Sequence, residues 1–143
     1  MTIVQATENE VISFIERYPY TKNVMCMGED SLTLFTTDDN NQITAFLSAF
    51  FREIPAPRNG KTECFINVID VIDTALQGSG IGSMLVQEII RYAKSKGVLQ
   101  VRAYCDIHNV TSHMLWQKNG FGISPGKNAD GSIFGSFVTF RIQ

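Results

Sequence analysis

The segment Gln77-Gly78-Ser79-Gly80-Ile81-Gly82 decides how this chain folds. It follows residues 62–72, TECFINVIDVI, whose content of Phe, Ile and Val is typical of a central strand. It precedes residues 82–96, where apolar side chains recur at the three- and four-residue spacing of an amphipathic helix. The run 98–105, VLQVRAYC, reads as another strand. This order of strand, loop, helix and strand predicts a right-handed parallel crossover.

The glycines of this loop predict a local anion-binding site. The first turn of a helix leaves N–H groups unpaired at the positive end of the helix dipole, and glycine lets a ligand approach them closely. Two nucleotide-binding motifs do not fit. The dinucleotide fingerprint read from Gly78 requires glycine where Ser83 stands, and the P-loop fails at the same position. The plain alternative is a glycine turn that only packs the helix against the sheet.

The remaining segments predict a mixed α/β (α+β) fold, with an antiparallel front before the strand–helix–strand unit. The signals are capping residues, alternating apolar residues and turn residues. In chain order, the other expected elements are a short strand at 3–4, a helix opened by a Thr7–Glu10 capping box and ended by Pro19, a hairpin of strands 31–36 and 42–51 around a turn at 38–41, a loop at Pro55, Pro57 and Asn59-Gly60, a short helix from Asn109 through Lys118, and a last strand at 132–142.

Length and composition indicate one ordinary domain. The chain has 143 residues, of which 44% are hydrophobic and 18% charged, and this predicts a single globular domain over residues 1–143 rather than a disordered chain. The net charge of −2 gives no field that would steer the protein onto nucleic acid or an anionic membrane. Neither is therefore expected as a partner.

The cysteines Cys26, Cys64 and Cys105 form an odd set without the spacing of a zinc site, so no metal is expected. Each has apolar neighbours, which favours packing in a reducing, cytoplasmic environment. The N-terminus lacks the pattern of a secretory signal, and no run approaches about 18 apolar residues. The sequence therefore predicts neither secretion nor a membrane span.

Gln77, Gly80 and Gly82 fit the pattern Gln/Arg-x-x-Gly-x-Gly/Ala, and in this pattern the sequence resembles the GNAT family of N-acetyltransferases. In that family the loop wraps the pyrophosphate of acetyl-CoA. A second signature over residues 109–121, NVTSHMLWQKNGF, resembles the family's Asn-x-x-Ala-x-x-Leu-Tyr-x-Lys-x-Gly-Phe. The resemblance is good from about Phe65 to Phe121 and implies the family's mixed, mostly antiparallel sheet with a parallel β-α-β unit that binds acyl-CoA.

The resemblance also implies a function. The expected activity is that of an acetyl-CoA-dependent N-acetyltransferase, which passes an acyl group to a primary amine by direct attack in a ternary complex. The co-substrate is acetyl-CoA, and the acceptor is a small-molecule or peptide amine. The alternative is a non-catalytic acyl-CoA-binding module of the same fold.

By resemblance, the pantetheine arm lies in a gap beside the central strand, and the glycine loop holds the pyrophosphate. Asn109 is expected to hydrogen-bond the pantetheine, although a plain helix cap explains the same residue. Lys118 lies near the cofactor or is a solvated lysine. The cofactor-binding residues expected on this basis are Asp70, Val71, Ile72, Gln77, Gly78, Ser79, Gly80, Ile81, Gly82, Ser83, Asn109 and Trp116.

The expected catalytic residues are Tyr104 and Asp70. Tyr104 stands where some relatives have a catalytic glutamate, and the backbone N–H near Asp70 is the expected donor to the oxyanion that forms when an amine attacks the thioester. Ile66 occupies the glutamate position of other relatives. Trp116 replaces a tyrosine that serves as the acid, and an indole N–H does not deliver a proton at neutral pH. The base is left open among Asp70, Asp73, Asp106 and His108.

Two further features have more than one interpretation. Glu63 opens the central strand and is either a solvated strand end or a group that binds a cationic substrate. The Phe-rich segment 132–142 either fills the core or pairs with a second copy of the chain in a homodimer.

Overall fold

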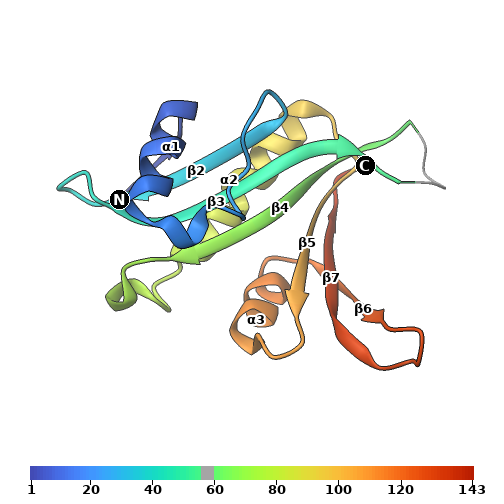
Figure 1. Cartoon of the computed structure of the whole chain (residues 1–143). Coiled ribbons are helices and arrows are strands. Elements are labelled where there is room, and N and C mark those ends of the chain that lie inside the picture. The colour runs from blue at the N-terminus through green and yellow to red at the C-terminus, as the bar shows by residue number, and fades with distance from the viewer. Residues whose placement is uncertain (56–59) are drawn as a thin grey trace.

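The computed structural model describes residues 1–55 and 60–143, so Pro57 and Asn59 of the predicted loop lie outside the described residues. A seven-stranded sheet runs through the molecule in the order β1-β2-β3-β4-β5-β7-β6 (Figure 1). The strands are β1 (Thr2–Gln5), β2 (Ser31–Thr37), β3 (Ile43–Glu53), β4 (Thr62–Val71), β5 (Gln100–Asp106), β6 (Gly122–Lys127) and β7 (Ile133–Arg141). The helices are α1 (Glu8–Arg17), α2 (Ile81–Lys96) and α3 (Val110–Lys118), with short 3₁₀ turns η1 (Pro19–Thr21) and η2 (Thr74–Leu76).

The sheet is antiparallel except between β4 and β5, which pair in parallel and are joined through α2. The predicted mixed sheet and its parallel crossover are therefore confirmed. The glycine loop lies between η2 and α2, and η2 follows β4. It is held at the end of a central strand, because β4 is paired with β3 on one side and β5 on the other.

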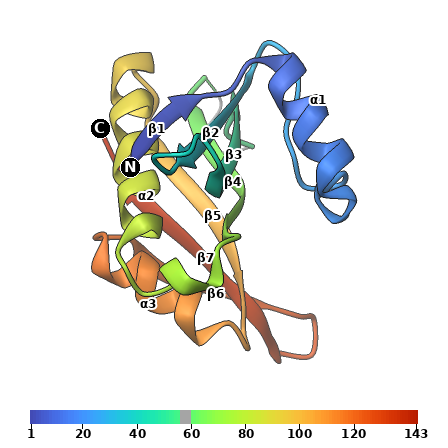
Figure 2. The same cartoon turned by 90° about the vertical axis from the view of Figure 1, so that its left-hand side faces the viewer.

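Helices cover both faces of the sheet (Figure 2). On one face, α2 buries Leu85, Val86 and Ile89 in a cluster with Leu47 of β3 and Val101 of β5. On the other face, α1 packs onto β2 and β3, where Phe14 meets Phe35 and Phe46 with ring centroids 5.0 and 4.9 Å apart. No helix in residues 1–55 or 60–143 combines the length and apolarity required to cross a membrane.

The predicted capping box at the start of α1 is present. The Thr7 hydroxyl oxygen accepts from the Glu10 N–H at 3.2 Å, and the Glu10 carboxylate accepts from the Thr7 N–H at 3.1 Å. The two contacts pair N–H groups that the helix itself leaves free.

Strand β6 is absent from the sequence-based prediction. Its sequence GISPGK contains two glycines and a proline, which are depleted in strands, and most of its residues are exposed. A proline is tolerated there because β6 lies at the sheet edge. Since β7 lies between β5 and β6, both of its edges are already paired, and strand addition by a second copy at β7 is excluded.

The ladder between β4 and β5 is short. It comprises four residue pairs, from Glu63–Gln100 to Ile66–Ala103, although both strands continue beyond it. Figure 1 shows the two strands separating after this point. The register of β4 on β3 shifts here, because Ser48 pairs with Val68 whereas Ala49 pairs with Ile66, which makes Asn67 the extra residue of a β-bulge. A bulge bends and twists its strand, and this explains why β4 turns away from β5.

Glu63 lies at the closed end of this ladder and is completely buried. Arg102 donates from Nε and Nη2 to its two carboxylate oxygens, each at 2.9 Å, and Arg52 and Gln100 add contacts of 2.9 Å. Burial alone raises the pKa of the Glu63 carboxyl, but the hydrogen bonds from Arg102, Gln100 and Arg52 outweigh it and hold the pKa below its ordinary value. Both interpretations of Glu63 from the sequence are wrong, because the carboxylate is neither solvated nor open to a substrate.

Replacing Glu63 should therefore be costly. Glu63→Gln leaves two partly exposed arginines without their counter-charge, and we expect the free energy of unfolding to fall by about 1.5–3 kcal/mol in urea denaturation at pH 7. Glu88→Gln is the matched control, because Glu88 pairs with Arg91 at the surface and such exposed pairs contribute little to stability. Equal losses in the two variants would contradict the role assigned to the buried cluster.

The same carboxylate predicts a pH dependence. Because the pKa of Glu63 is lowered in the folded state, its contribution is fully present above the unfolded pKa of about 4.3 and is lost as the pH falls through the folded value. The stability difference between the wild type and Glu63→Gln should then shrink below about pH 4. Urea titrations between pH 7 and pH 3 measure it, and a constant difference would refute the prediction.

Candidate functional site

A pocket of about 610 Å³ lies between the open part of the β4–β5 gap, the start of α2 and the start of α3. It gathers nine of the residues expected from the sequence to bind the cofactor, which are Asp70, Val71, Gln77, Gly78, Gly80, Ile81, Gly82, Ser83 and Asn109. Lys118, for which the sequence leaves two interpretations open, also lines the pocket. The lining residues that are not predicted from the sequence are Ile69, Leu76, Thr111, Ser112, Met114 and Leu115.

The glycine loop adopts a conformation that only glycine takes easily. Gly78 and Gly80 have φ angles of 81° and 92°, in the left-handed region. Gly80 precedes α2 and gives the helix no side-chain cap. Within the described residues, no hydrogen bond from the N–H groups of Ile81, Gly82 or Ser83 is recorded. The first turn of α2 therefore presents free donors, and the positive end of the helix dipole, to the pocket.

Ser79 is in the loop but outside the pocket wall. Its N–H donates to the Leu76 carbonyl at 3.1 Å, and its hydroxyl donates to the same oxygen. Both contacts tie the loop back onto η2. Ser79 thus holds the loop in place, whereas the glycines on either side of it face the pocket.

The open edge of β4 follows from the register with β3. Ile72 donates its N–H to the Thr44 carbonyl at 2.8 Å, and Asp70 pairs with Phe46 two residues away. Antiparallel ladders alternate, so the N–H groups of Asp70 and Ile72 face β3, whereas those of Ile69 and Val71 face the gap. The free donors on this edge therefore come from Ile69 and Val71, and Ile72 lies outside the pocket.

The carboxyl of Asp70 is on the face of the sheet that α1 and η1 cover. It shares that face with Val68 and Ile72, which pack beside the aromatic cluster under α1. Burial raises the pKa of the Asp70 carboxyl, and this outweighs the Val71 N–H and the Tyr20 hydroxyl, which lower it. Of the four open candidates for the base, Asp70 is the one that lines the pocket.

None of the other three candidates lines the pocket, and the carboxylates of Asp73 and Asp106 are used locally. Asp73 caps η2 by accepting from the Ala75 N–H at 3.1 Å, and Asp106 accepts from the His108 N–H at 2.9 Å. These local contacts stabilise a cap at Asp73 and a turn at Asp106, which is a sufficient structural role for both residues. Among the described residues there is also no group of three or more His, Cys, Asp or Glu side chains that could hold a metal ion.

Tyr104 is the first residue of β5 beyond the ladder and does not line the pocket. Its hydroxyl donates to the Phe134 carbonyl at 3.1 Å, and its ring stacks on Phe134 with centroids 6.0 Å apart. The side chain is nevertheless 42% exposed. Tyr104 is therefore held over β7 with its hydroxyl hydrogen already donated.

Asn109 and Trp116 belong to α3 and differ in position. The Asn109 side-chain oxygen accepts from the Ser112 N–H at 3.0 Å and caps the helix, while the residue also lines the pocket. Its amide nitrogen is therefore available to a ligand. Trp116 is 2% exposed, packs on Phe121 and donates from its indole N–H to Ser112 at 3.2 Å, so it belongs to the core rather than to the pocket wall.

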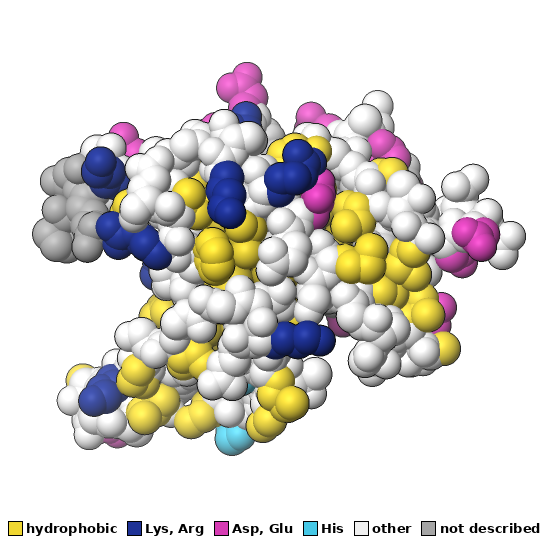
Figure 3. Space-filling view, turned by 180° about the vertical axis from the view of Figure 1, so that it is seen from behind, with side chains coloured by type: hydrophobic (Ala, Val, Ile, Leu, Met, Phe, Trp, Pro, Cys, Tyr) yellow, Lys and Arg dark blue, Asp and Glu magenta, His cyan; other side chains and the backbone are white. Residues whose placement is uncertain are grey.

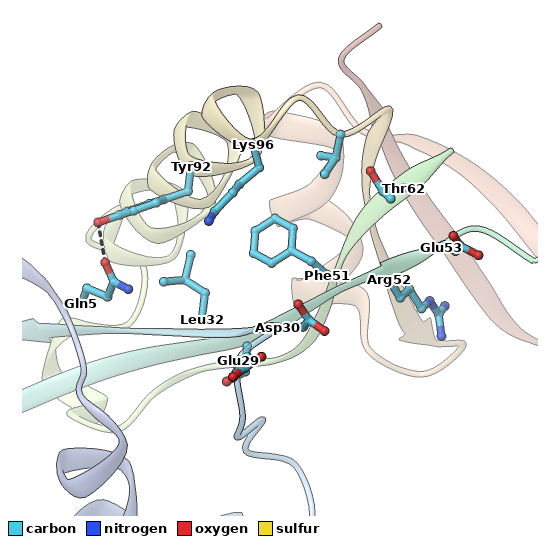
Figure 4. Close-up of a pocket in the computed structure, with 12 residues that line it drawn as sticks. Gln5, Glu29, Asp30, Leu32, Phe51, Arg52, Glu53, Thr62, Tyr92 and Lys96 are labelled. Carbon is cyan, nitrogen blue, oxygen red and sulfur yellow. Dashed lines mark hydrogen bonds between the residues drawn. The ribbon is translucent and has the colours of Figure 1, made fainter. Parts of the chain in front are cut away.

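A second hollow of about 550 Å³ lies at the other end of α2 (Figure 4). Phe51 and Leu32 form an apolar floor, with Lys96 and Tyr92 of α2 above and the acidic Asp30 opposite. The Tyr92 hydroxyl donates to the Gln5 side chain at 3.1 Å. Its acidic residues and Lys96 are exposed, and Arg52 is paired with Glu63. The described residues that line it include no helix N-terminus, in contrast to the pocket at the glycine loop.

The described residues form no broad basic patch on the face that carries α2 (Figure 3). Figure 3 shows Lys and Arg side chains spread singly among neutral atoms on this face. An anion bound here would therefore be held by local groups. The free N–H groups at the start of α2 are such groups.

Comparison with known proteins identifies the family. A model of the acetyltransferase (GNAT) family matches residues 4–121. A curated protein of Bacillus subtilis (strain 168), which carries the provisional name phosphinothricin acetyltransferase, is 34% identical over 100 residues. That match covers 68% of this chain and 60% of the relative, so the chain spans less than two thirds of the relative's length.

Solved structures agree with the fold. An Escherichia coli N-acetyltransferase for an alanine of a ribosomal protein superimposes with a TM-score of 0.71 at 17% identity, covering 99% of this chain and 93% of that one. The Arabidopsis thaliana protein NAA60, solved with acetyl-CoA, superimposes with a TM-score of 0.72 at 13% identity, covering 99% of each chain. The predicted fold class and family resemblance are confirmed, and acetyl-CoA is the co-substrate that fits them.

The loop geometry predicts a difference between two neighbouring glycines. Gly80→Ala should lower the free energy of unfolding by about 1–2 kcal/mol, because a side chain is strained in the left-handed region. Gly82→Ala should cost less, because Gly82 is helical and the added carbon meets only the movable end of Leu115 at 3.3 Å. Chemical denaturation of both variants tests this, and a larger loss for Gly82→Ala would contradict it.

Proposed function

Because the chain belongs to the acetyltransferase (GNAT) family, we propose that it transfers the acetyl group of acetyl-CoA to a primary amine. The observation that carries the proposal is the pocket, which joins the uncapped N-terminus of α2 to the open edge of β4. An anion and an extended chain can be bound there side by side. Acetyl-CoA has both parts, a pyrophosphate and a pantetheine arm.

The residues of the pocket fit this molecule. The N–H groups of Ile81, Gly82 and Ser83 would hold the pyrophosphate at the helix N-terminus. The backbone of Ile69 and Val71 would pair with the amides of the pantetheine arm as a neighbouring strand does. When bound, acetyl-CoA supplies a thioester from which the acetyl group passes to an amine.

Asn109 and Asp70 complete the proposed site from opposite sides of the gap. The Asn109 amide nitrogen, free after capping α3, would donate to a pantetheine carbonyl. Asp70 would take the proton from the incoming amine, since its raised pKa brings it closer to the pH at which a base is effective. The N–H of Val71, next to Asp70, faces the gap and would donate to the carbonyl oxygen of the acetyl group.

We propose direct transfer between the two substrates in a ternary complex. No residue that lines the pocket is a cysteine, so a thiol does not accept the acetyl group there. The thiol of Cys64 is buried, and burial, followed by the nearby Cys26 and Glu63, raises its pKa to about 12. All three thiols are free, which suits the reducing cytoplasm that we propose as the compartment.

The proposed acceptor is a small-molecule or peptide amine. The name of the Bacillus subtilis relative points to a small amino compound, and the Escherichia coli neighbour acts on the alanine of a protein. We propose no nucleic acid and no membrane as partner. A homodimer would have to form through surfaces other than β7, whose edges are paired.

One observation favours a second candidate, a module that binds acyl-CoA without turnover. Ile66 is buried, Trp116 lies in the core, and the Tyr104 hydroxyl is engaged with Phe134. None of the three is positioned to exchange a proton with a ligand in the pocket. This candidate predicts thermal stabilisation by CoA, about 2.7 kcal/mol at a hundredfold excess over the Kd, without thiol release.

Incubation with acetyl-CoA and a broad panel of primary amines tests the enzyme. Free thiol should form faster with at least one amine than without protein. Thermal stabilisation by CoA with no thiol release from any amine would favour the binding module. Absence of both effects would refute the proposed function altogether.

Asp70→Asn tests the proposed base. With the best amine of the panel, kcat should fall about 100-fold or more while the KM for acetyl-CoA changes little, since general-base catalysis contributes about 10²–10⁴. In the wild type, kcat should also fall as the pH drops through the raised pKa of Asp70. Asp39→Asn, in the exposed turn between β2 and β3, is the control. Unchanged kcat in Asp70→Asn would exclude Asp70 as the base.

A further inference from the structure

Three polar side chains connect α2 with the end of α3 behind the glycine loop. Gln87 Nε2 donates to Asn119 Oδ1 at 2.9 Å, and Asn119 Nδ2 donates to Ser83 Oγ at 3.0 Å. Asn119 is 9% exposed, whereas Ser83 lines the pocket. Sequence reasoning singled out Ser83 for its place in the loop and identified neither of the other two.

The direction of these hydrogen bonds is determined by a backbone group. Asn119 Nδ2 also donates to the carbonyl of Leu115 at 2.8 Å. A carbonyl oxygen can only accept, so the amide nitrogen of Asn119 must face Leu115 and Ser83, and its oxygen must face Gln87. The two hydrogens of the amide are then both used. Gln87 fits this orientation, because its NH₂ group can donate to the amide oxygen of Asn119.

This direction determines where the Ser83 hydroxyl hydrogen points. A hydroxyl has one hydrogen, and because Ser83 Oγ accepts from Asn119, that hydrogen cannot point toward Asn119. Within the described residues, no acceptor for it is recorded. Ser83 belongs to the first turn of α2 and lies in the pocket wall. Its hydroxyl hydrogen is therefore available to a ligand in the pocket.

We propose that Asn119 and Gln87 are positioning residues that hold the Ser83 hydroxyl with its hydrogen directed into the pocket, where it donates to the pyrophosphate of acetyl-CoA. The proposal rests on the proposed function, because it takes the anion in the pocket to be this pyrophosphate. A charged oxygen is a stronger acceptor than a neutral one, so a hydroxyl prepared in this way adds to the free N–H groups beside it. The site thus uses a buried amide to orient a donor of the first turn.

The test is a double-mutant cycle on the dissociation constant for CoA, measured by titration calorimetry. In Asn119→Asp, the carboxylate accepts the Ser83 hydroxyl hydrogen and draws it away from the pocket. Affinity for CoA should fall at least about tenfold, because a hydrogen bond to a charged group is worth about 1.4 kcal/mol or more. Ser83→Ala should lose about the same factor.

The same change in the Ser83→Ala background separates orientation from added charge. There the hydroxyl is already gone, so Asn119→Asp should cause a much smaller further loss, which measures the effect of the charge alone. Asn119→Leu removes the donor without adding an acceptor or a charge and should weaken CoA binding less than Asn119→Asp. Melting curves without ligand identify any variant that fails to fold. If Asn119→Asp does not fold, Asn119→Leu replaces it in the cycle.

Steady-state kinetics add a readout that a merely structural role would not produce. The KM for acetyl-CoA should rise in Asn119→Asp while kcat at saturation stays within about twofold, because the pyrophosphate is remote from the reacting atoms. Two results would overturn the positioning role. One is that Asn119→Asp loses the same CoA affinity in the wild type and in Ser83→Ala, and the other is that Asn119→Asp binds CoA as tightly as the wild type. If the wild type does not bind CoA, the proposed function fails first and this inference with it.

Discussion

The early end of the parallel ladder between β4 and β5 is the constraint on which the rest of the structure depends. Four residue pairs join the strands, and beyond Ile66 and Ala103 each strand continues alone. Backbone groups need hydrogen-bond partners, so the open edge of β4 in the middle of the sheet is left to water or to a ligand in the pocket. The bulge at Asn67, which shifts the register of β4 on β3, turns β4 away from β5, and the gap and the pocket beside it follow from this departure from regular pairing.

Within a few residues, β4 is tightly joined to its neighbours at one end and separates from β5 at the other. On the closed side, Glu63 binds Arg52 of β3 and Arg102 of β5 and so joins three strands. On the open side, the bulge at Asn67 turns the strand away. A carboxylate buried between two guanidinium groups is costly to separate, and this opposes any spreading of the gap toward the core. The site thus has one fixed end and one open end.

The strong local patterns were sufficient to predict the fold. The Thr7–Glu10 capping box, the glycine loop and the apolar stripe of α2 are each determined by neighbours in sequence, and each formed as expected. Strand β6 was not predictable, because GISPGK has no strand propensity and becomes a strand only through pairing with β7. Glu63 was misjudged for a related reason. Its partners Arg52, Gln100 and Arg102 lie 11, 37 and 39 residues away, so its environment depends on strand register. The same holds for Ile69. Its N–H faces the gap only because alternate residues of β4 hydrogen-bond to β3, and this depends on the register of the two strands.

The missing side-chain cap at Gly80 has a consequence for motion as well as for binding. A helix whose first N–H groups have no partner is incompletely paired until a ligand arrives, and the positive φ of Gly80 leaves no side chain to substitute. Amide hydrogens at such an end exchange with solvent through small local openings rather than through global unfolding. The first turn of α2 is therefore expected to open more readily than the middle of the helix. A bound anion would supply the missing acceptors. Binding in the pocket would then reduce local opening at the start of α2, the helix that connects the two parallel strands.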